Sequence, residues 1–567
     1  MYISNYRRRS KAVFLVFFIF LLLCVGRLLF ILFFRSSYLS SLAKKQHNQF
    51  VELEPRRGTI YDCNLKAQAF NLSMDSLYAE PNTIKGRDKE EVIDKLLPIL
   101  GTGRDYLKDR IYRKKSFIWL ARKLPPEKSA AIKALRLKGL GFMKETKRIY
   151  PNSYLASHVI GFSGMDNVGL AGAEKDFDGY LKGTAGWAVF LRDARQNKLD
   201  IWEKMVLPVD GMDLVLTIDE VIQYIAEREL DKVFRDFHAK GASIVVMDPH
   251  TGRILAMASR PSYDLNNYSS ADSAHMRNRA ICDLFEPGSV FKIVTASAAL
   301  EEKKITEEDK IFCENGSYRV GGHILHDHRP HGILSFREVI EESSNIGTVK
   351  VAQLLGPDIV YQYLRAFGFG SKLGIDISGE ISGMIKQPRA WSKTSISAIP
   401  IGQEVGVTAL QLASAISVIA NGGQLMKPYI VDSIRDRQGR VIKQNKPVLI
   451  RKVISVDTAM RIKKILTGVV EVGTGRLAKV PGFSAAGKTG TAQKLEPNGA
   501  YSHNKFVASF IGFAPAEDPL LAIVVTVDEP RPYYFGGVVA APVFQKVAAD
   551  AIRYIKGNEI PARGMAQ

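Results

Sequence analysis

The feature of this sequence that most constrains its fold is an apolar segment near the N-terminus, residues 12–34. The segment is apolar throughout, except for Gly26 and Arg27. Its length is close to the roughly 20 residues that a helix needs to cross the hydrocarbon core of a bilayer. We therefore expect one transmembrane helix here, with the rest of the chain folded on one side of a membrane.

The charges before this segment predict its orientation. Between positions 7 and 11 the chain has basic residues and no acidic residue, namely Arg7, Arg8, Arg9 and Lys11. By the positive-inside rule, residues 1–11 form a cytoplasmic tail and the chain after residue 34 lies outside. The apolar stretch is too long for a cleaved signal peptide, and no cleavage site of small residues follows it, so we expect an uncleaved anchor in the cytoplasmic (inner) membrane. Arg27 either snorkels to the interface or meets a partner helix.

The rest of the chain is long and hydrophobic enough for a large core, since 46% of its 567 residues are hydrophobic. Its formal net charge of +20 could indicate nucleic-acid binding, but no nucleic-acid fold signature is present and the predicted topology places the charge outside. Attraction to anionic lipids or wall polymers, and a solvated surface without a specific partner, both stay open. Three cysteines follow the anchor and cannot all pair with one another, namely Cys63, Cys282 and Cys313.

After the anchor the chain divides into two parts. Residues 36–49 are polar with a helical pattern, as in a stalk, and residues 51–211 mix short strands and helices without a nucleophile constellation. We assign residues 35–212 to this stalk and a non-catalytic pedestal, which we interpret as a docking surface rather than a spacer. Residues 213–556 form the second part, and residues 557–567 form a tail.

The second part has the pattern of an α+β domain. The expected elements are a strand at 213–219, a helix at 220–237, a hairpin of strands at 242–248 and 254–259, helices from 289 to 418, strands at 485–493, 506–513 and 521–527, and a terminal helix at 543–555. Periodicity alone does not give the number of strands in the sheet.

A candidate nucleophile opens the helical region. Ser289 follows Pro287 and Gly288, which signal a turn, and Lys292 comes one helical turn later on the same face. A serine hydroxyl needs an adjacent base, and a lysine in that role must be neutral, with a pKa lowered by burial and nearby positive charge. Free N–H groups at the start of the helix favour the negative charge of a tetrahedral intermediate.

Two further motifs supply the other groups of such a site. Ser343 and Asn345 form an S-x-N motif, in which the serine can relay a proton and the asparagine can bind a substrate amide and hold Lys292. A K-T-G-T run offers a charge for a substrate carboxylate, two hydroxyls on one strand face and a glycine where a substrate backbone approaches, at Lys488, Thr489, Gly490 and Thr491. The N–H of Thr491 is the expected second oxyanion donor, beside that of Ser289.

An isolated S-x-x-K match is a weak signal, because roughly two are expected by chance in a chain of this length. The sequence has two others, Ser41 with Lys44 and Ser502 with Lys505. Neither stands with partner motifs in the required order, so we interpret both as surface residues. Ser289 precedes S-x-N and K-T-G in the order of serine enzymes that react with penicillin-like substrates.

A histidine-rich stretch invites a metal interpretation. Four histidines surround Asp327, at positions His323, His326, His328 and His331. Their spacing fits no metal motif, and glycines and Pro330 indicate a loop at the rim of the site. We expect no metal and no organic cofactor.

The three motifs and their surroundings resemble a class B penicillin-binding protein, a peptidoglycan transpeptidase. The resemblance runs from Arg56 to Phe544 and includes motifs at 56–62, 148–151, 158–161, 169–174, 216–219, 247–252, 286–289, 402–403, 408–413, 420–423 and 536–544. Two departures lie in the pedestal. The family's Asp-Arg-Asn-Gly reads Asp62-Cys63-Asn64-Leu65, and Ala173 stands where isoleucine is usual.

The resemblance implies a five-stranded antiparallel sheet flanked by helices. It also implies a serine D,D-transpeptidase that cross-links peptidoglycan stem peptides, lipid-linked or on nascent glycan, through an acyl-enzyme, and that beta-lactams acylate. A SEDS-type membrane glycosyltransferase and other division proteins are the implied partners. The 536–544 motif favours the septal, cell-division branch, with the elongation branch as the alternative. A beta-lactamase, a beta-lactam sensor or an inactive scaffold are the rival functions.

Overall fold

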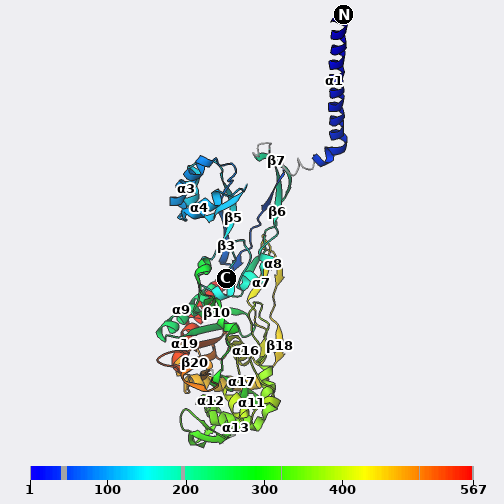
Figure 1. Cartoon of the computed structure of the whole chain (residues 1–567). Coiled ribbons are helices and arrows are strands. Elements are labelled where there is room, and N and C mark those ends of the chain that lie inside the picture. Colours follow the sequence, from blue (N-terminus) through cyan, green and yellow to red (C-terminus); the bar gives the residue numbers. More distant parts are fainter. Residues whose placement is uncertain are drawn as a thin grey trace. The chain divides into compact units, whose positions relative to one another are not determined.

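The computed structural model describes residues 2–39, 48–115, 117–192, 198–320, 322–496 and 498–564. The chain forms two compact units, and each consists of two stretches of sequence. The first unit is residues 1–56 with 183–210, and the second is residues 57–182 with 211–567. Figure 1 shows the whole chain coloured along its sequence.

The first unit begins with the apolar segment. Helix α1 (Tyr2–Phe30) continues through a π-helical turn, Ile31–Arg35. Within the described residues, Arg7–Leu39 is the one helix that is long and apolar enough to cross a membrane. The Arg27 guanidinium lies 5.7 Å from the ring centroid of Phe30. One N-terminal apolar helix of this kind fits a single-pass membrane anchor.

The first unit also holds a small antiparallel sheet in the order β1-β6-β7. Its strands are β1 (Asn48–Leu53), β6 (Gly186–Arg192) and β7 (Lys198–Val206). The prediction of a polar helix over 36–49 is wrong at its end, because Asn48 and Gln49 begin β1. Pairing with Leu191 and Phe190 of β6 decides their conformation, as tertiary contacts commonly override local propensity. Residues 40–47 of the predicted stalk lie outside the described residues.

The pedestal part of the second unit is built on a seven-stranded sheet. The sheet joins pedestal strands to strands that follow residue 212, in the order β17-β16-β8-β2-β3-β4, with β5 paired to β3. The strands are β2 (Ile60–Tyr61), β3 (Ala67–Ala79), β4 (Ile118–Leu124), β5 (Leu140–Ile149), β8 (Asp213–Leu216), β16 (Val431–Arg435) and β17 (Val441–Gln444). Helices α3 (Gly86–Leu100), α4 (Arg104–Ile111) and α5 (Pro126–Ala134) bury a separate small core with β3 and β4.

Three of the pedestal motifs meet in one buried ion cluster. Glu174 is fully buried and accepts from Arg57 Nε and Arg148 Nε, both at 2.6 Å. The guanidinium of Arg57 also contacts Asp178 at 2.5 Å. Gly58, beside Arg57, packs against the backbone carbonyl of Met212 so closely that no Cβ fits. These motif residues therefore hold together pedestal segments that are far apart in the sequence.

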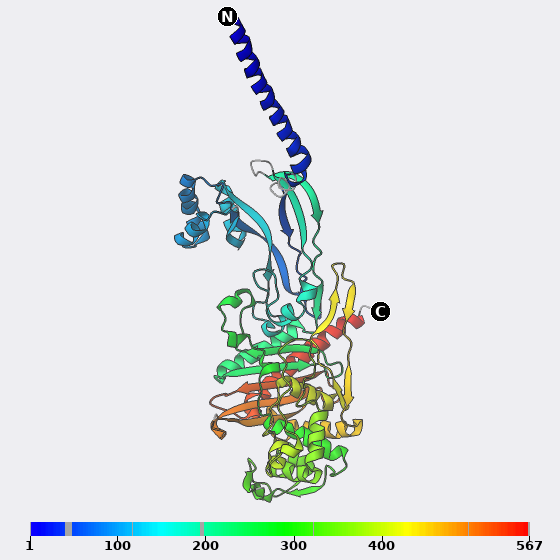
Figure 2. The same ribbon diagram turned by 45° about the vertical axis from the view of Figure 1, so that its right-hand side comes forward.

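The part of the second unit that follows residue 212 also has a five-stranded sheet in which every neighbouring pair is antiparallel, in the order β10-β9-β21-β20-β19. The strands are β9 (Gly241–Met247), β10 (Ile254–Arg260), β19 (Ala486–Leu495), β20 (Tyr501–Ala514) and β21 (Leu521–Asp528). Figure 2 shows the green β9 and β10 beside the orange strands from the end of the chain. The fold is α+β, as the sequence predicts.

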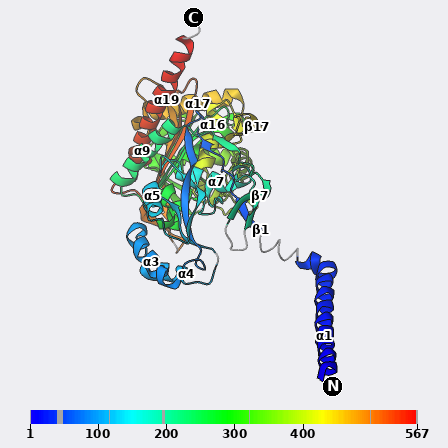
Figure 3. The same ribbon diagram turned by 90° about the horizontal axis from the view of Figure 1, so that it is seen from above.

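Helices cover both faces of this sheet. Alternate residues along β9 belong to different cores, since Ile244 packs with α9 (Glu220–Asp236) and α19 (Ala541–Gly564), whereas Val245 packs with α16 (Ala409–Ala420). This alternation is the two-residue period of a strand that is buried on both faces. Figure 3 shows α9 and α19 lying along one another. On the other face lie α11 (Lys292–Glu301), which directly follows the turn of Ser289, and α17 (Val456–Glu471).

Several elements differ from the predicted boundaries. The helical region also holds two short antiparallel sheets, pairing β11 (Lys310–Phe312) with β14 (Ile333–Ser335) and β12 (Ser317–Val320) with β13 (His323–His326). The terminal helix continues past the predicted end at residue 555 to Gly564, because one glycine lowers helix preference without ending a helix. All four cysteines are free thiols.

Candidate active site

The predicted nucleophile sits on a tight turn. Residues Gly288–Phe291 form a 3-10 turn that leads into α11, and Gly288 has φ +59°. Gly402 packs on the backbone of Gly288, and the Gly288 N–H donates to the Gly402 carbonyl at 3.1 Å. Two glycines therefore let two backbone segments touch directly behind Ser289. Ser289 is half-buried.

Lys292 is the first residue of α11 and is fully buried. Its Nζ donates to the Ser343 carbonyl at 2.6 Å, to Asn345 Oδ1 at 2.8 Å and to Ser343 Oγ at 3.2 Å. Burial, and secondly the charge of Lys488, hold the pKa of Lys292 well below its ordinary value. The structure thus joins a lysine that readily loses its proton to the S-x-N motif, one helical turn after Ser289.

Ser343 lies between two buried lysines. Its Oγ is 2.9 Å from Lys488 Nζ and 3.2 Å from Lys292 Nζ. Burial lowers the pKa of Lys488 to about 7, so that near neutral pH this lysine is partly uncharged. Ser343 itself has φ +61°, an uncommon backbone conformation for a residue with a side chain. Lys488 Nζ donates to Ser343 Oγ, and the role of its charge toward a substrate carboxylate stays a prediction.

Asp327 supports the S-x-N motif, although its role was not predicted. Its carboxylate accepts from Ser344 Oγ at 2.7 Å, from the Asn345 N–H at 2.5 Å and from the Ile346 N–H at 3.0 Å. These contacts cap α13 (Asn345–Leu355) at its N-terminus, where carboxylates are favoured. The sequence signal was an aspartate in a glycine- and proline-bounded loop, but sequence gives no indication that the loop reaches α13.

The histidine-rich stretch also helps to hold Asn345 of the S-x-N motif. The carbonyl of His326 accepts from Asn345 Nδ2 at 2.9 Å, which fixes the orientation of the amide whose Oδ1 binds Lys292. The His328 ring lies 5.0 Å from that of Phe535. Within the described residues, three or more histidine, cysteine or carboxylate side chains do not gather as they would around a metal. The side chain of His323 lies outside the described part.

The K-T-G-T run lies on β19, the edge strand of the sheet. The Thr489 hydroxyl pairs with that of Thr474 at 2.9 Å, and Thr491 Oγ1 accepts from the Gly536 N–H at 3.0 Å. The structure gives a different reason for Gly490 than substrate approach. A Cβ there would press on Ser509 and come within 2.9 Å of the Pro287 carbonyl, so the glycine lets the nucleophile turn pack on β19.

The competing S-x-x-K match at Ser502 does not form such a site, and the prediction of a surface serine is wrong there, because Ser502 is buried. Ser502 Oγ bonds Asn504 Oδ1 at 2.9 Å in the hairpin that opens β20, and Lys505 pairs with Glu496. Ser41 and Lys44 lie outside the described residues. Within the described chain, the three motifs supply side chains that acyl transfer uses: a serine in the turn before α11, a lysine with a lowered pKa, and a hydroxyl between two lysines that can pass a proton.

Comparison with known families places the same residues in two known domains. Residues 242–549 match the family described as Penicillin binding protein transpeptidase domain, and residues 52–216 match the Penicillin-binding Protein dimerisation domain. The five-stranded sheet and the three motifs lie within the first match. The buried Arg57, Arg148 and Glu174 lie within the second.

Individual proteins match over most of their length. The chain is 37% identical to Stage V sporulation protein D of Bacillus subtilis, over 97% of this chain and 87% of that protein. It is 31% identical to Peptidoglycan D,D-transpeptidase FtsI of Escherichia coli K12, over 88% of this chain and 84% of that protein. Penicillin binding protein 3 of Mycobacterium tuberculosis, complexed with aztreonam, matches with TM-score 0.70 and 28% identity, over 89% of this chain and 97% of that one.

Proposed function

The chain belongs to the class B penicillin-binding proteins, the peptidoglycan D,D-transpeptidases, and we propose that Ser289 is the residue that carries the acyl group. Ser289 Oγ attacks the carbonyl of the penultimate D-alanine of a stem peptide and gives its proton to neutral Lys292. The bond to the terminal D-alanine breaks, and Ser343 passes a proton to the leaving amine. An amine of a neighbouring stem peptide then attacks the ester, forms the cross-link and restores Ser289.

The observation that carries this proposal is the convergence of Lys292 and Lys488 on Ser343 Oγ. Two ammonium groups a few ångströms apart in a buried site cannot both stay charged without a large cost, so the pair favours one neutral lysine. A neutral lysine is the base that a serine nucleophile needs. Asn345 holds Lys292 in place, and the charged form of Lys488 favours the neutral form of Lys292.

We propose that the donor stem peptide lies along β19. As the edge strand, β19 leaves one row of backbone N–H and C=O groups without a partner strand. An extended peptide can add there as a further strand. Thr489, Gly490 and Thr491 line this position, and the Thr491 N–H then joins that of Ser289 as the pair of oxyanion donors.

The test is acylation of the full-length chain in lipid nanodiscs by a fluorescent penicillin, beside Ser289→Ala. Stable labelling over hours that the variant loses supports an acyl-enzyme on Ser289. Labelling that decays within minutes would indicate a beta-lactamase instead. A folded protein that takes up no label contradicts the assignment of the nucleophile and favours the inactive scaffold.

We propose that the anchor is residues 12–34, with residues 1–11 in the cytoplasm and both the pedestal (35–212) and the transpeptidase domain (213–556) outside. The basic residues before the apolar segment support this orientation. The test places a single cysteine at Ser10 or at the exposed Ser378, in a chain whose native cysteines are replaced by alanine. In intact spheroplasts, a membrane-impermeant maleimide should label the second position and not the first; the reverse pattern contradicts the orientation.

We propose a role in septal wall synthesis, with a SEDS-type glycosyltransferase as the membrane partner. The match to FtsI of Escherichia coli supports this role. The match to Stage V sporulation protein D of Bacillus subtilis supports a second candidate, wall synthesis during sporulation. Expression in cells depleted of each relative separates the two, because rescue of division or of sporulation identifies the matching role. Co-purification with the polymerase of the rescued cell tests the partner.

A further inference from the structure

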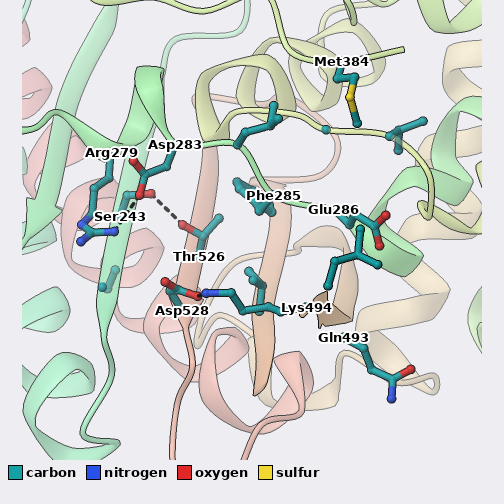
Figure 4. Close-up of a pocket in the computed structure, with 17 residues that line it drawn as sticks. Ser243, Arg279, Asp283, Phe285, Glu286, Met384, Gln493, Lys494, Thr526 and Asp528 are labelled. Atoms are coloured by element: carbon teal, nitrogen blue, oxygen red, sulfur yellow. Dashed lines mark hydrogen bonds and ion pairs between the residues drawn. The ribbon is translucent and has the colours of Figure 1, made fainter. Parts of the chain in front are cut away.

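A cavity of about 280 Å³ lies beside the nucleophile turn and is separate from the site of Ser289, Lys292 and Lys488. Its floor is one end of the five-stranded sheet, including Ser243 of β9 and Thr526 of β21 (Figure 4). Its roof is three backbone segments joined by short bridges, in which Phe285 pairs with Val407 and Met384 pairs with Gly406. The cavity therefore lies between the sheet and the chain that leads into Ser289.

The lining has the composition of a small-ligand site. Its middle is apolar, with Phe285, Val405 and Val507, and its mouth has two half-exposed apolar side chains, Leu284 and Met384. Ligand pockets are typically apolar with a few charged groups that orient the ligand. Exposed apolar side chains that border a concave site are typical of binding surfaces.

The charges of the lining are unequal. Arg279 pairs with Asp283 at 2.7 Å, and Lys494 pairs with Asp528 at 2.6 Å, as Figure 4 shows for the second pair. Glu286 is a third carboxylate of the lining and has no cation partner among the described residues. Asp283 also pairs with Arg277 at 2.7 Å, and Lys494 also pairs with Glu529 at 2.8 Å. Of the carboxylates in the lining, Glu286 is therefore the one that an added cation can reach without displacing an ion pair among the described residues.

Glu286 also links the cavity to the nucleophile. Its Oε1 accepts from the Glu404 N–H at 2.9 Å and from the Tyr501 hydroxyl at 3.2 Å, while its buried Oε2 has no partner in the described chain. Only Pro287 and Gly288 separate Glu286 from Ser289. A movement of this carboxylate therefore releases two contacts directly before the turn that positions the Ser289 N–H.

We propose that this cavity is a regulatory site for a small apolar amine, whose ammonium draws the Glu286 carboxylate away from Glu404 and Tyr501 and thereby slows acylation of Ser289. The apolar middle holds the ring or alkyl part of the ligand, and its ammonium pairs with the Glu286 carboxylate, whose Oε2 has no partner in the described chain. The effect on acylation rests on the proposed function of Ser289, whereas binding to the cavity does not.

The test uses tryptamine as the probe and the full-length chain in nanodiscs. Calorimetry should show saturable binding of tryptamine with a dissociation constant below about 1 mM. The matched anion 3-indolepropionate, with the same ring, should bind at least tenfold more weakly. Saturating tryptamine should slow acylation by a fluorescent penicillin at least threefold.

Variants distinguish this cavity from other sites. Met384→Trp and, independently, Leu284→Trp fill the mouth and should abolish tryptamine binding, whereas Val441→Trp on β17 should leave it unchanged. Glu286→Gln should remove the preference for tryptamine over 3-indolepropionate.

Binding that both mouth variants retain, or a preference that Glu286→Gln retains, overturns the proposal. Binding without slower acylation, in a chain that is acylated, overturns the regulatory part. A chain that binds tryptamine but is never acylated refutes the proposed function and leaves the site supported.

Discussion

At the scale of single residues, the site depends on two lysines whose pKa values are lowered, so that their charged forms are disfavoured. Lys292 and Lys488 are both fully buried, and each contacts Ser343 Oγ. Burial disfavours the charged form of each, and the charge of Lys488 further lowers the pKa of Lys292. The sequence predicted that Lys292 must be neutral through burial and nearby positive charge, but it could not show that Lys488 is the neighbouring charge that adds to the effect of burial.

The pH dependence of acylation tests this pairing. In Lys488→Gln the neighbouring charge is gone, so the pKa of Lys292 rises and its base form appears only at higher pH. The rising limb of the acylation rate between pH 5 and 9 should therefore move to higher pH, and each unit of movement slows acylation about tenfold at a pH below it. Stopped-flow acylation measures the limb. If the rising limb of Lys488→Gln lies at the same pH as that of the unsubstituted chain, this result contradicts the coupling between Lys488 and Lys292.

Asp327 provides a second prediction at this scale. Asp327→Ala removes the carboxylate that caps α13 and orders Asn345, so we expect a loss of about 1–2 kcal/mol of unfolding free energy and at least tenfold slower acylation. Ser335→Ala is the matched control, because it removes an N-cap from α12 (Phe336–Glu341) away from Asn345. Equal loss of acylation in both variants would show that Asp327 acts only on stability. Thermal unfolding and acylation rates are measured together.

At the scale of elements, alternation and turn residues predicted the strands of the five-stranded sheet well. The hairpin of β9 and β10 and the strands β19 to β21 were found close to their predicted positions, because their apolar runs end at clear turn signals. The number of strands came from the resemblance alone, and their order was not predicted. The support of Asn345 by Asp327 and His326, and the bond from Glu286 to Tyr501, could not be predicted, since they join segments whose contact depends on the folded chain.

The substitution Gly490→Ala tests how the turn that contains Ser289 packs on β19. In Gly490→Ala the new methyl group presses on Ser509 and on Val290, which lies in the turn beside Ser289. We expect overpacking to cost about 1–3 kcal/mol of unfolding free energy and to slow acylation. Gly179→Ala is the control, because nothing lies within 4 Å of its added Cβ. A stable Gly490→Ala variant with unchanged acylation would refute the packing role.

At the scale of the whole molecule, the pedestal motifs act as a structural connection between distant segments. Glu174 compensates two buried guanidinium groups, those of Arg57 and Arg148. Removing one partner of such a cluster leaves buried charges unpaired, which is far more costly than losing an exposed ion pair. The sequence motifs predicted that this region belongs to the pedestal, but the meeting of the three motifs at one carboxylate is visible only in the structure.

Glu174→Gln should therefore destabilise the chain by about 3–5 kcal/mol and lower its thermal unfolding midpoint. Glu90→Gln is the control, because it removes an exposed ion pair with Arg104 in the same pedestal and should change the midpoint little. Differential scanning calorimetry of both variants measures the difference. Equal midpoints for the two variants would contradict a structural role for the cluster.

The seven-stranded sheet has a consequence for how such a chain can evolve. Its strands come from both the pedestal and the region after residue 212, with β8 hydrogen-bonded to β2 on one side and to β16 on the other. A recombination event that exchanged one half of the gene would bring together strands selected in different ancestors. Inherited mosaics should thus keep β2, β8 and β16 from a single parent, and the helices α3, α4 and α5 should be inherited together with β3 and β4, with which they share a core.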